Sequence, residues 1–84
     1  MNNTIMRKII VTETYAALSS ESLIGSVTIS CLPTNAADVN FKGDDGEDVP
    51  WKPGQWIDFR SVDLADIFIK GTAGDIVTAI GGTW

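Results

Sequence analysis

The sequence contains no histidine, a single cysteine and no long apolar run. Histidine is the commonest general base and metal ligand, so its absence argues against catalysis and transition-metal binding. One cysteine excludes an internal disulfide and argues against a structural zinc site. Cys31 lies in the alternating segment SVTISCL, where we expect a small buried hydrophobe. No apolar run approaches the roughly 18–20 residues of a membrane span, so no membrane association is expected.

The chain also lacks the apolar core of a signal peptide. The short apolar run after Arg7 and Lys8 breaks at Thr12 and Glu13. We therefore expect synthesis in a cytoplasm, and release only by a route other than secretion. Eighty-four residues predict one small domain. The core of such a domain is thin, and small domains commonly gain stability by forming oligomers.

The net charge of −5 is placed unevenly along the chain. Residues 1–37 carry two basic and two acidic side chains, which balance. Residues 38–75 carry four basic and nine acidic side chains, and 4 − 9 = −5. Because an acidic half repels a phosphate backbone, nucleic-acid binding is not expected.

Apolar and polar residues alternate with the period of β-strands through most of the chain. The alternating segments are residues 5–15, 22–32, 38–43, 55–59, 66–71 and 75–82. They predict an all-β fold, a small antiparallel β-sandwich or jelly-roll-like barrel of about six or seven strands. Residues 1–25 are expected to form an N-terminal strand or arm with a connecting loop, and residues 26–84 the sandwich, within a single folded unit.

Turn residues separate these segments. Pro53 and Gly54 occupy the two central positions of a predicted type II turn, where proline presets φ and glycine accepts positive φ. Residues 71–75, GTAGD, predict a hairpin loop between two apolar strands. Residues 16–23, AALSSESL, contain a serine cluster that favours a loop or a single turn over a helix.

The loop GDDGED offers four acidic side chains as possible calcium ligands: Asp44, Asp45, Glu47 and Asp48. Their spacing differs from that of an EF-hand, and no glutamate stands at its twelfth position. Acids beside glycine more often form solvated turns that accept hydrogen bonds from their own backbone. We expect such a turn, and no metal or cofactor.

Candidate catalytic groups are present but isolated. Asp58, Asp63 and Asp66 lie near predicted strand ends without a cleft that would bring two carboxylates together. Ser19, Ser20 and Ser22 have no histidine to activate them. The sequence therefore predicts a protein that is not an enzyme, with no catalytic residues.

The three tryptophans have few obvious places in so small a core. Trp56 is expected to cap the core, whereas Trp51, expected on a loop, and Trp84 are typical of subunit or partner interfaces. The expected interface comprises Trp51, Trp84, Trp56, Ile9, Val11 and Tyr15. An indole face also stacks on sugar rings, so a carbohydrate site stays open as an alternative.

From about Ser26 onward, the order of segments resembles small structural domains of tailed phages. SVTISCL leads to TNAADVNFKGDDGEDVPWKPGQW and then to VDLADIFIKGTAGDIVTAIGG. Phage capsid decoration (cement) and head-fibre proteins often carry a similar series. In it, an Asn-rich turn precedes a strand, a proline–glycine turn follows, and a further strand ends near a glycine-containing hairpin. Residues 35–43, 53–54 and 63–71 match these three pieces, and the segment KGDD departs where a second glycine is expected.

The resemblance implies a non-enzymatic virion protein on the phage head that binds the major capsid protein. Such proteins commonly form homotrimers at capsid symmetry axes, and the N-terminal strand could pair with a neighbouring subunit. Two alternatives remain open. One is a carbohydrate-binding or attachment module of a phage tail or fibre, with Trp51 or Trp84 as its stacking platform. The other is a head–tail connector component.

Overall fold

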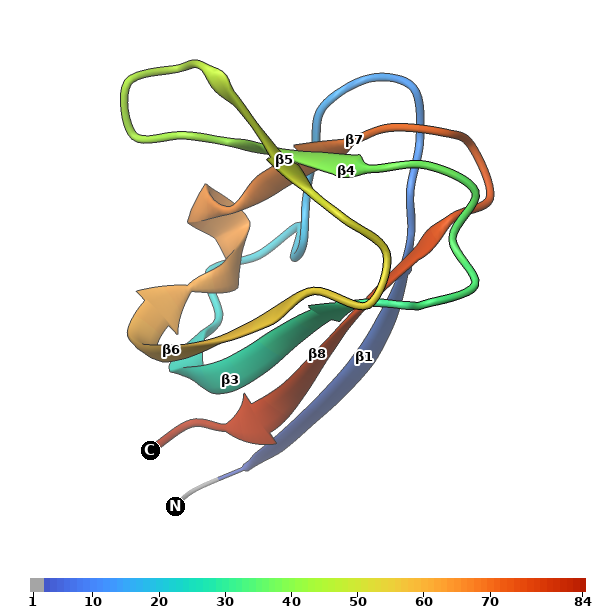
Figure 1. The fold of residues 1–84 in the computed structure, drawn as a ribbon. Helices are drawn as coiled ribbons and strands as arrows, with labels where there is room; N and C mark the ends of the chain where they lie inside the picture. Colours follow the sequence, from blue (N-terminus) through green and yellow to red (C-terminus); the bar gives the residue numbers. More distant parts are fainter. Residues whose placement is uncertain (1–2) are drawn as a thin grey trace.

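The computed structural model describes residues 3–84, which form two four-stranded antiparallel sheets facing each other (Figure 1). Its elements are β1 (Thr4–Ile10), β2 (Ala16–Ala17), β3 (Ile24–Cys31), β4 (Val39–Lys42), β5 (Asp48–Trp51), β6 (Trp56–Asp63), the 3-10 turn η1 (Leu64–Asp66), β7 (Phe68–Lys70) and β8 (Ile76–Gly82). Sheet A has the strand order β1-β8-β3-β6, and sheet B has the order β2-β7-β4-β5. The predicted all-β, sandwich-like fold is confirmed, with eight strands in place of six or seven.

The alternating run of residues 5–15 does not form one strand. β1 pairs with β8 from Thr4 to Ile10, after which the chain crosses to sheet B and β2 pairs with β7. Val11 is buried at this crossing, and its N–H donates to the Asp75 carbonyl (2.8 Å). β1 is therefore a strand of the sandwich itself, and the expected boundary after residue 25 falls inside β3. Residues 1–2 of the expected arm lie outside the described residues.

The prediction of a hairpin at residues 71–75 is wrong, because β7 belongs to sheet B and β8 to sheet A. The segment is a second crossover between the layers, and it runs beside the first. Gly71 N–H donates to the Thr12 carbonyl (2.9 Å) and Gly74 N–H to the Val11 carbonyl (3.2 Å). Gly74 has φ +95°, which glycine adopts without the steric penalty of a side chain. The sequence pattern of a short glycine loop is the same for a hairpin and for a crossover.

The core lies between the two sheets. Alternate residues of β3 point inward, and Cys31 is only 1% exposed, as predicted for a small buried hydrophobe. The buried apolar residues are Ile5, Val11, Leu18, Val27, Ile29, Cys31, Val39, Phe41, Trp51, Leu64, Ile69, Val77 and Ala79. Full burial of an aliphatic side chain contributes about 1.5–3 kcal/mol, so this single cluster supplies the main driving force for folding.

Two turns follow the sequence predictions. Gln55 N–H donates to the Lys52 carbonyl (3.0 Å) and Gly54 has φ +87°, which confirms the type II turn. In the turn between β4 and β5, Glu47 N–H donates to the Asp45 carboxylate (3.0 Å), and both acidic side chains are exposed. Residues 43–47 of the GDDGED segment therefore form a solvated turn that accepts a hydrogen bond from its own backbone, whereas Asp48 is the first residue of β5 and pairs with Lys42.

Candidate protein-binding face

The outer face of sheet A, which points away from sheet B, carries alternate residues of all four strands. The strand registers align Met6, Ile80, Thr28 and Asp58 in one row, and Lys8, Thr78, Ser30 and Trp56 in the next. Ile10 and Ile76 pair just beyond them. Residues in between, such as Val77 and Ala79, are fully buried and point to the core. We call Met6, Ile10, Trp56, Ile76 and Ile80 the outer patch.

The outer patch is apolar and largely open to solvent. Met6 is 72% exposed, Trp56 59%, Ile80 54% and Ile10 52%. Single exposed apolar residues are ordinary, but a group of them on one sheet face marks an interaction surface. The two aligned rows contain one basic and one acidic residue, Lys8 and Asp58, so the net charge of these two rows is zero.

Two tryptophans five residues apart occupy opposite environments. Trp51, on β5, is 7% exposed and stacks on Phe41, with ring centroids 3.9 Å apart and planes at 19°. The Phe59 ring of β6 lies nearly parallel to it at 6.3 Å, so Trp51 joins the aromatic residues of both sheets. Trp56 lies outside the core, on the outer patch. The predicted roles, Trp56 in the core and Trp51 on a presenting loop, are therefore reversed.

The neighbours of Trp56 along β6 explain this correction. Trp56 shares its strand face with Asp58, whereas Phe59, which lies on the other face, packs against the core. The Thr28 hydroxyl donates to the Asp58 carboxylate, and this keeps Asp58 on the solvent side of the sheet. The sequence signal was present, because a carboxylate two residues along the strand marks the exposed face.

The other expected interface residues are divided by burial. Val11, at 1% exposed, lies in the core together with Trp51, so the expectation of a partner contact is wrong for both. Ile9 is half-buried against the core, and Tyr15 is half-buried at the side of sheet B. Trp84 is 62% exposed and remains accessible. Sequence reasoning missed Met6, Ile10 and Ile80, although both faces of the first alternating segment carry apolar residues.

Tyr15 belongs to a polar cluster on sheet B. Its hydroxyl donates to the Asp48 carboxylate, and Lys70 Nζ lies 3.4 Å from Asp48 Oδ2 and 4.6 Å from the centre of the Tyr15 ring. The hydrogen bond to Asp48 is the main reason that the pKa of Tyr15 is raised to about 12. The same bond, followed by Lys70, lowers the pKa of Asp48. The cluster ties the first crossover to β5 and β7.

The carboxylates considered for catalysis serve separate structural purposes. Asp63 accepts hydrogen bonds from the Ser22 hydroxyl (2.6 Å) and from the N–H groups of Leu23 (2.9 Å) and Ala65 (3.0 Å). These donors, the Ser22 hydroxyl first, lower the pKa of Asp63. Asp58 lies on the outer face of sheet A. Within residues 3–84, no three cysteine or acidic side chains are grouped closely enough to hold a metal ion.

Cys31 and Asp75 are buried on the inner side of the fold. Burial, followed by the charges of Asp38 and Asp75, raises the pKa of the Cys31 thiol to about 11. The Asp75 carboxylate accepts hydrogen bonds from the N–H groups of Ala36 (2.9 Å) and Ala37 (3.3 Å). These contacts attach the loop before β4 to the start of β8, and they account for an acidic residue that is only 8% exposed.

No family model, no curated protein and no solved structure matches this chain. None of the helical segments within residues 3–84 is long and apolar enough to cross a membrane.

Proposed function

We propose that this chain is a non-enzymatic structural protein that binds another protein through the outer patch of sheet A. The specific partner in this proposal is the major capsid protein of a phage head, and the chain is a decoration protein. The observation that carries the proposal is the exposed apolar face that includes Met6, Trp56 and Ile80. The order of segments from Ser26 to Gly71 is similar to that of phage decoration and head-fibre proteins and supports the choice of partner, whereas residues 71–75 form a crossover in place of the hairpin of that series.

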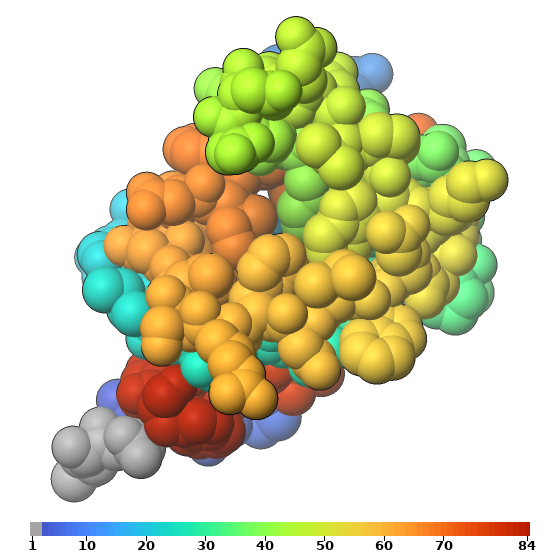
Figure 2. All heavy atoms as spheres, turned by 60° about the vertical axis from the view of Figure 1, so that its left-hand side comes forward, coloured from blue at the N-terminus to red at the C-terminus, as the bar shows by residue number. Residues whose placement is uncertain are grey.

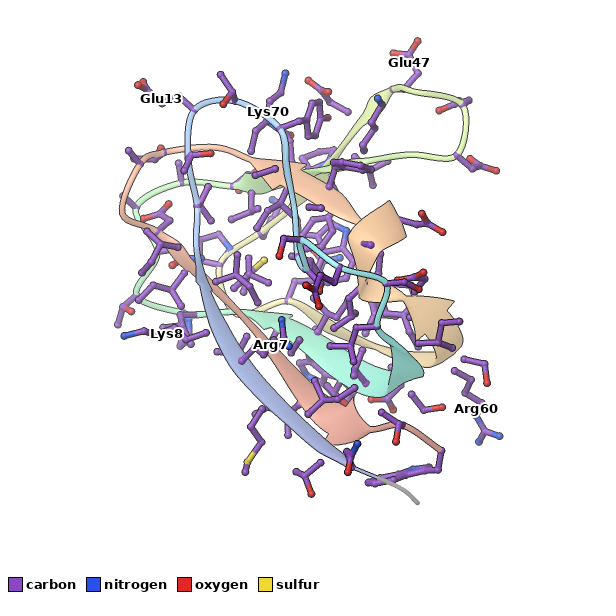
Figure 3. All side chains as sticks on the ribbon, turned by 180° about the vertical axis from the view of Figure 1, so that it is seen from behind. Arg7, Lys8, Glu13, Glu47, Arg60 and Lys70 are labelled. Carbon is purple, nitrogen blue, oxygen red and sulfur yellow. The ribbon has the colours of Figure 1, made fainter. Side chains whose placement is uncertain are left out.

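The distribution of charge supports this use of the face. The hairpin of β4 and β5, which carries the exposed acids Asp44, Asp45 and Glu47, projects on the side opposite sheet A (Figure 1). Figure 3 shows Glu47 at one end of the molecule and Arg60 near the other. In this proposal the outer patch contacts the shell while the acidic turn stays in solvent.

The proposal includes self-association as a homotrimer. Sheet A ends at β1, whose second edge pairs with no described strand, and an open edge of seven residues favours contact with another chain. Light scattering on the purified protein should report a mass of three 9.0 kDa chains. A monomer at micromolar concentration would contradict self-association in solution, while leaving shell binding to be tested separately.

Shell binding can be measured on purified phage heads that lack the protein. Met6→Ser, Trp56→Ser and Ile80→Ser should each weaken binding roughly tenfold or more, because each removes a large apolar contact of about 1.5–2 kcal/mol. Val49→Ser is the matched control, since Val49 is an exposed apolar residue of sheet B. Equal loss in all four variants, or in none, would refute the outer patch as the binding surface.

The location of the labelled protein separates the alternatives. Electron cryo-microscopy should find it on the head in hundreds of copies. A location on the tail would favour the attachment module, and about a dozen copies at the neck would indicate a connector component.

A further inference from the structure

An open hollow of about 500 Å³ lies at the end of sheet A and is lined by Ser26, Arg60, Ser61 and Trp84. Its volume is within the roughly 300–1,000 Å³ of small-molecule sites. In Figure 2 the last residues of the chain (dark red) lie below those of β6 (yellow to light orange) at the lower end of the molecule. The hollow shares no residue with the outer patch but lies next to it, since Ser26 pairs with Gly82 in the row beside Thr28 and Ile80, and none of its side chains belongs to the buried core.

A β-bulge builds one wall of the hollow. Gly25 pairs with Val62 and Val27 with Phe59, so Arg60 and Ser61 together stand opposite Ser26. Ser61 has φ +50° and is the single non-glycine residue within residues 3–84 with positive φ. Bulges redirect side chains, and strained residues of this kind concentrate at ligand sites. The Ser61 N–H donates to Ser26 Oγ (3.2 Å), which holds the bulge in place.

Trp84 forms the other wall as a flat platform. The Ser26 hydroxyl donates to the main-chain oxygen of Trp84 (2.7 Å), so one serine contacts both walls. A Cβ built on Gly82 would lie 1.8 Å from Cζ3 of the indole and 2.2 Å from both Cε3 and Cη2. These near-equal distances show that the ring lies face-on against the Gly82 Cα, which glycine alone permits. Since the side chain is 62% exposed, the second face of the indole is open.

Arg60 supplies the charge of the site. Its side chain is exposed and extends from β6 into solvent (Figure 3). The sole ion pair within residues 3–84 joins Lys70 and Asp48, so no carboxylate in this part of the chain lies within ion-pair distance of Arg60. A free guanidinium binds a carboxylate through two parallel hydrogen bonds. The Ser61 hydroxyl adds a neutral donor and acceptor beside it.

We propose that this hollow binds a sugar that carries a carboxylate, with the pyranose ring stacked on Trp84 and the carboxylate held by Arg60. An open indole face suits the apolar C–H face of a pyranose, and Arg60 selects an acidic sugar over a neutral one. Ser61 contacts a ring hydroxyl. This site goes beyond shell binding, because it uses residues outside the outer patch and accepts a different class of ligand.

The test titrates the full chain with sodium glucuronate, glucose or sodium acetate. Proton–nitrogen NMR monitors the three indole N–H signals during each titration. Glucuronate should shift the Trp84 signal with a millimolar dissociation constant, about −4 kcal/mol or weaker, as expected for one stacked ring and one ion pair. Glucose should bind at least about tenfold more weakly, since it lacks the charged hydrogen bond to Arg60. Acetate alone should leave Trp84 unshifted.

Single substitutions measure the contribution of each wall to sugar binding. Arg60→Gln should reduce glucuronate binding to the level of glucose, and Trp84→Ala should abolish both. Gly82→Ala should weaken binding by displacing the indole, even though Arg60 is unchanged. Trp56→Ala is the matched control, because Trp56 is as exposed as Trp84 but lies outside the hollow, and it should bind glucuronate normally.

Three results would overturn the proposal. The first is no shift of the Trp84 signal at about 50 mM glucuronate, a concentration far above a millimolar dissociation constant. The second is equal binding of glucuronate and acetate. The third is a loss of glucuronate binding in Trp56→Ala as large as that in Trp84→Ala. Failure of shell binding is a separate result, because the outer-patch variants Met6→Ser and Ile80→Ser should keep the sugar site, and Arg60→Gln should keep shell binding.

Discussion

The opposite environments of Trp51 and Trp56 predict opposite effects of the same substitution. Trp51→Ala removes an indole that stacks on Phe41 and contacts Phe59, and such core truncations destabilise by about 3–5 kcal/mol. Trp56→Ala removes an indole that is 59% exposed, and should change the stability of the subunit by no more than about 0.5 kcal/mol. Small domains have about 5–15 kcal/mol in total, so the first variant should lose a large part of its stability.

Urea unfolding followed by far-ultraviolet circular dichroism measures both variants without relying on tryptophan fluorescence. With a slope of about 1 kcal/mol per molar urea, Trp51→Ala should lower the midpoint by about 3–5 M. Trp51→Phe keeps an aromatic ring in the stack, so its midpoint should fall between those of the parent and Trp51→Ala. This variant also keeps the comparison valid if the alanine form does not fold. A Trp56→Ala midpoint as low as that of Trp51→Ala would refute the assignment of the two residues.

Three further predictions concern the polar cluster, a close approach of strands and the acidic turn. Tyr15, the sole tyrosine, should titrate in ultraviolet absorbance with a pKa of about 12. The stability that its hydrogen bond contributes should be complete below about pH 10 and lost as the pH rises through 12, and Tyr15→Phe should remove this loss of stability at alkaline pH. Gly81→Ala should lower the Tm far more than Gly82→Ala, because its Cβ would lie 2.0 Å from the backbone oxygen of Ser26. Chelator should leave the Tm unchanged, and a fall of several degrees that calcium restores would show metal binding at Asp44, Asp45, Glu47 and Asp48.

The sequence predicted the elements that depend on local chemistry. Strand periodicity in residues 22–32 and 75–82 located β3 and β8, since each alternates side chains between the core and the outer face. Pro53 and Gly54 predicted their turn, because both residues restrict or permit φ by their covalent structure. The buried Cys31 followed from the same alternation. These features require no knowledge of which strands meet.

The predictions that were wrong concern features that depend on the pairing of distant strands. Nothing local distinguishes a hairpin at residues 71–75 from a crossover, because the choice depends on whether β7 pairs with β8 or with β2 and β4. The hollow at Trp84 was equally beyond local reasoning. It exists because Ser26, Arg60 and Gly82 are brought together by registers across three strands. The positive φ of Ser61 has no signal in the residue type.

The three tryptophans show how a small sandwich divides its largest side chains between folding and binding. Trp51 lies where sheets A and B meet, and it fills the stack between Phe41 and Phe59. Once this position is filled, the thin core has no second place for an indole, and Trp56 and Trp84 stay at 59% and 62% exposure. An indole that is more than half exposed contributes less to the stability of the subunit than a buried one, and it leaves apolar surface in contact with water. The two proposals assign a ligand to each of these residues: a partner protein to Trp56 on the outer patch, and an acidic sugar to Trp84, which lies on Gly82.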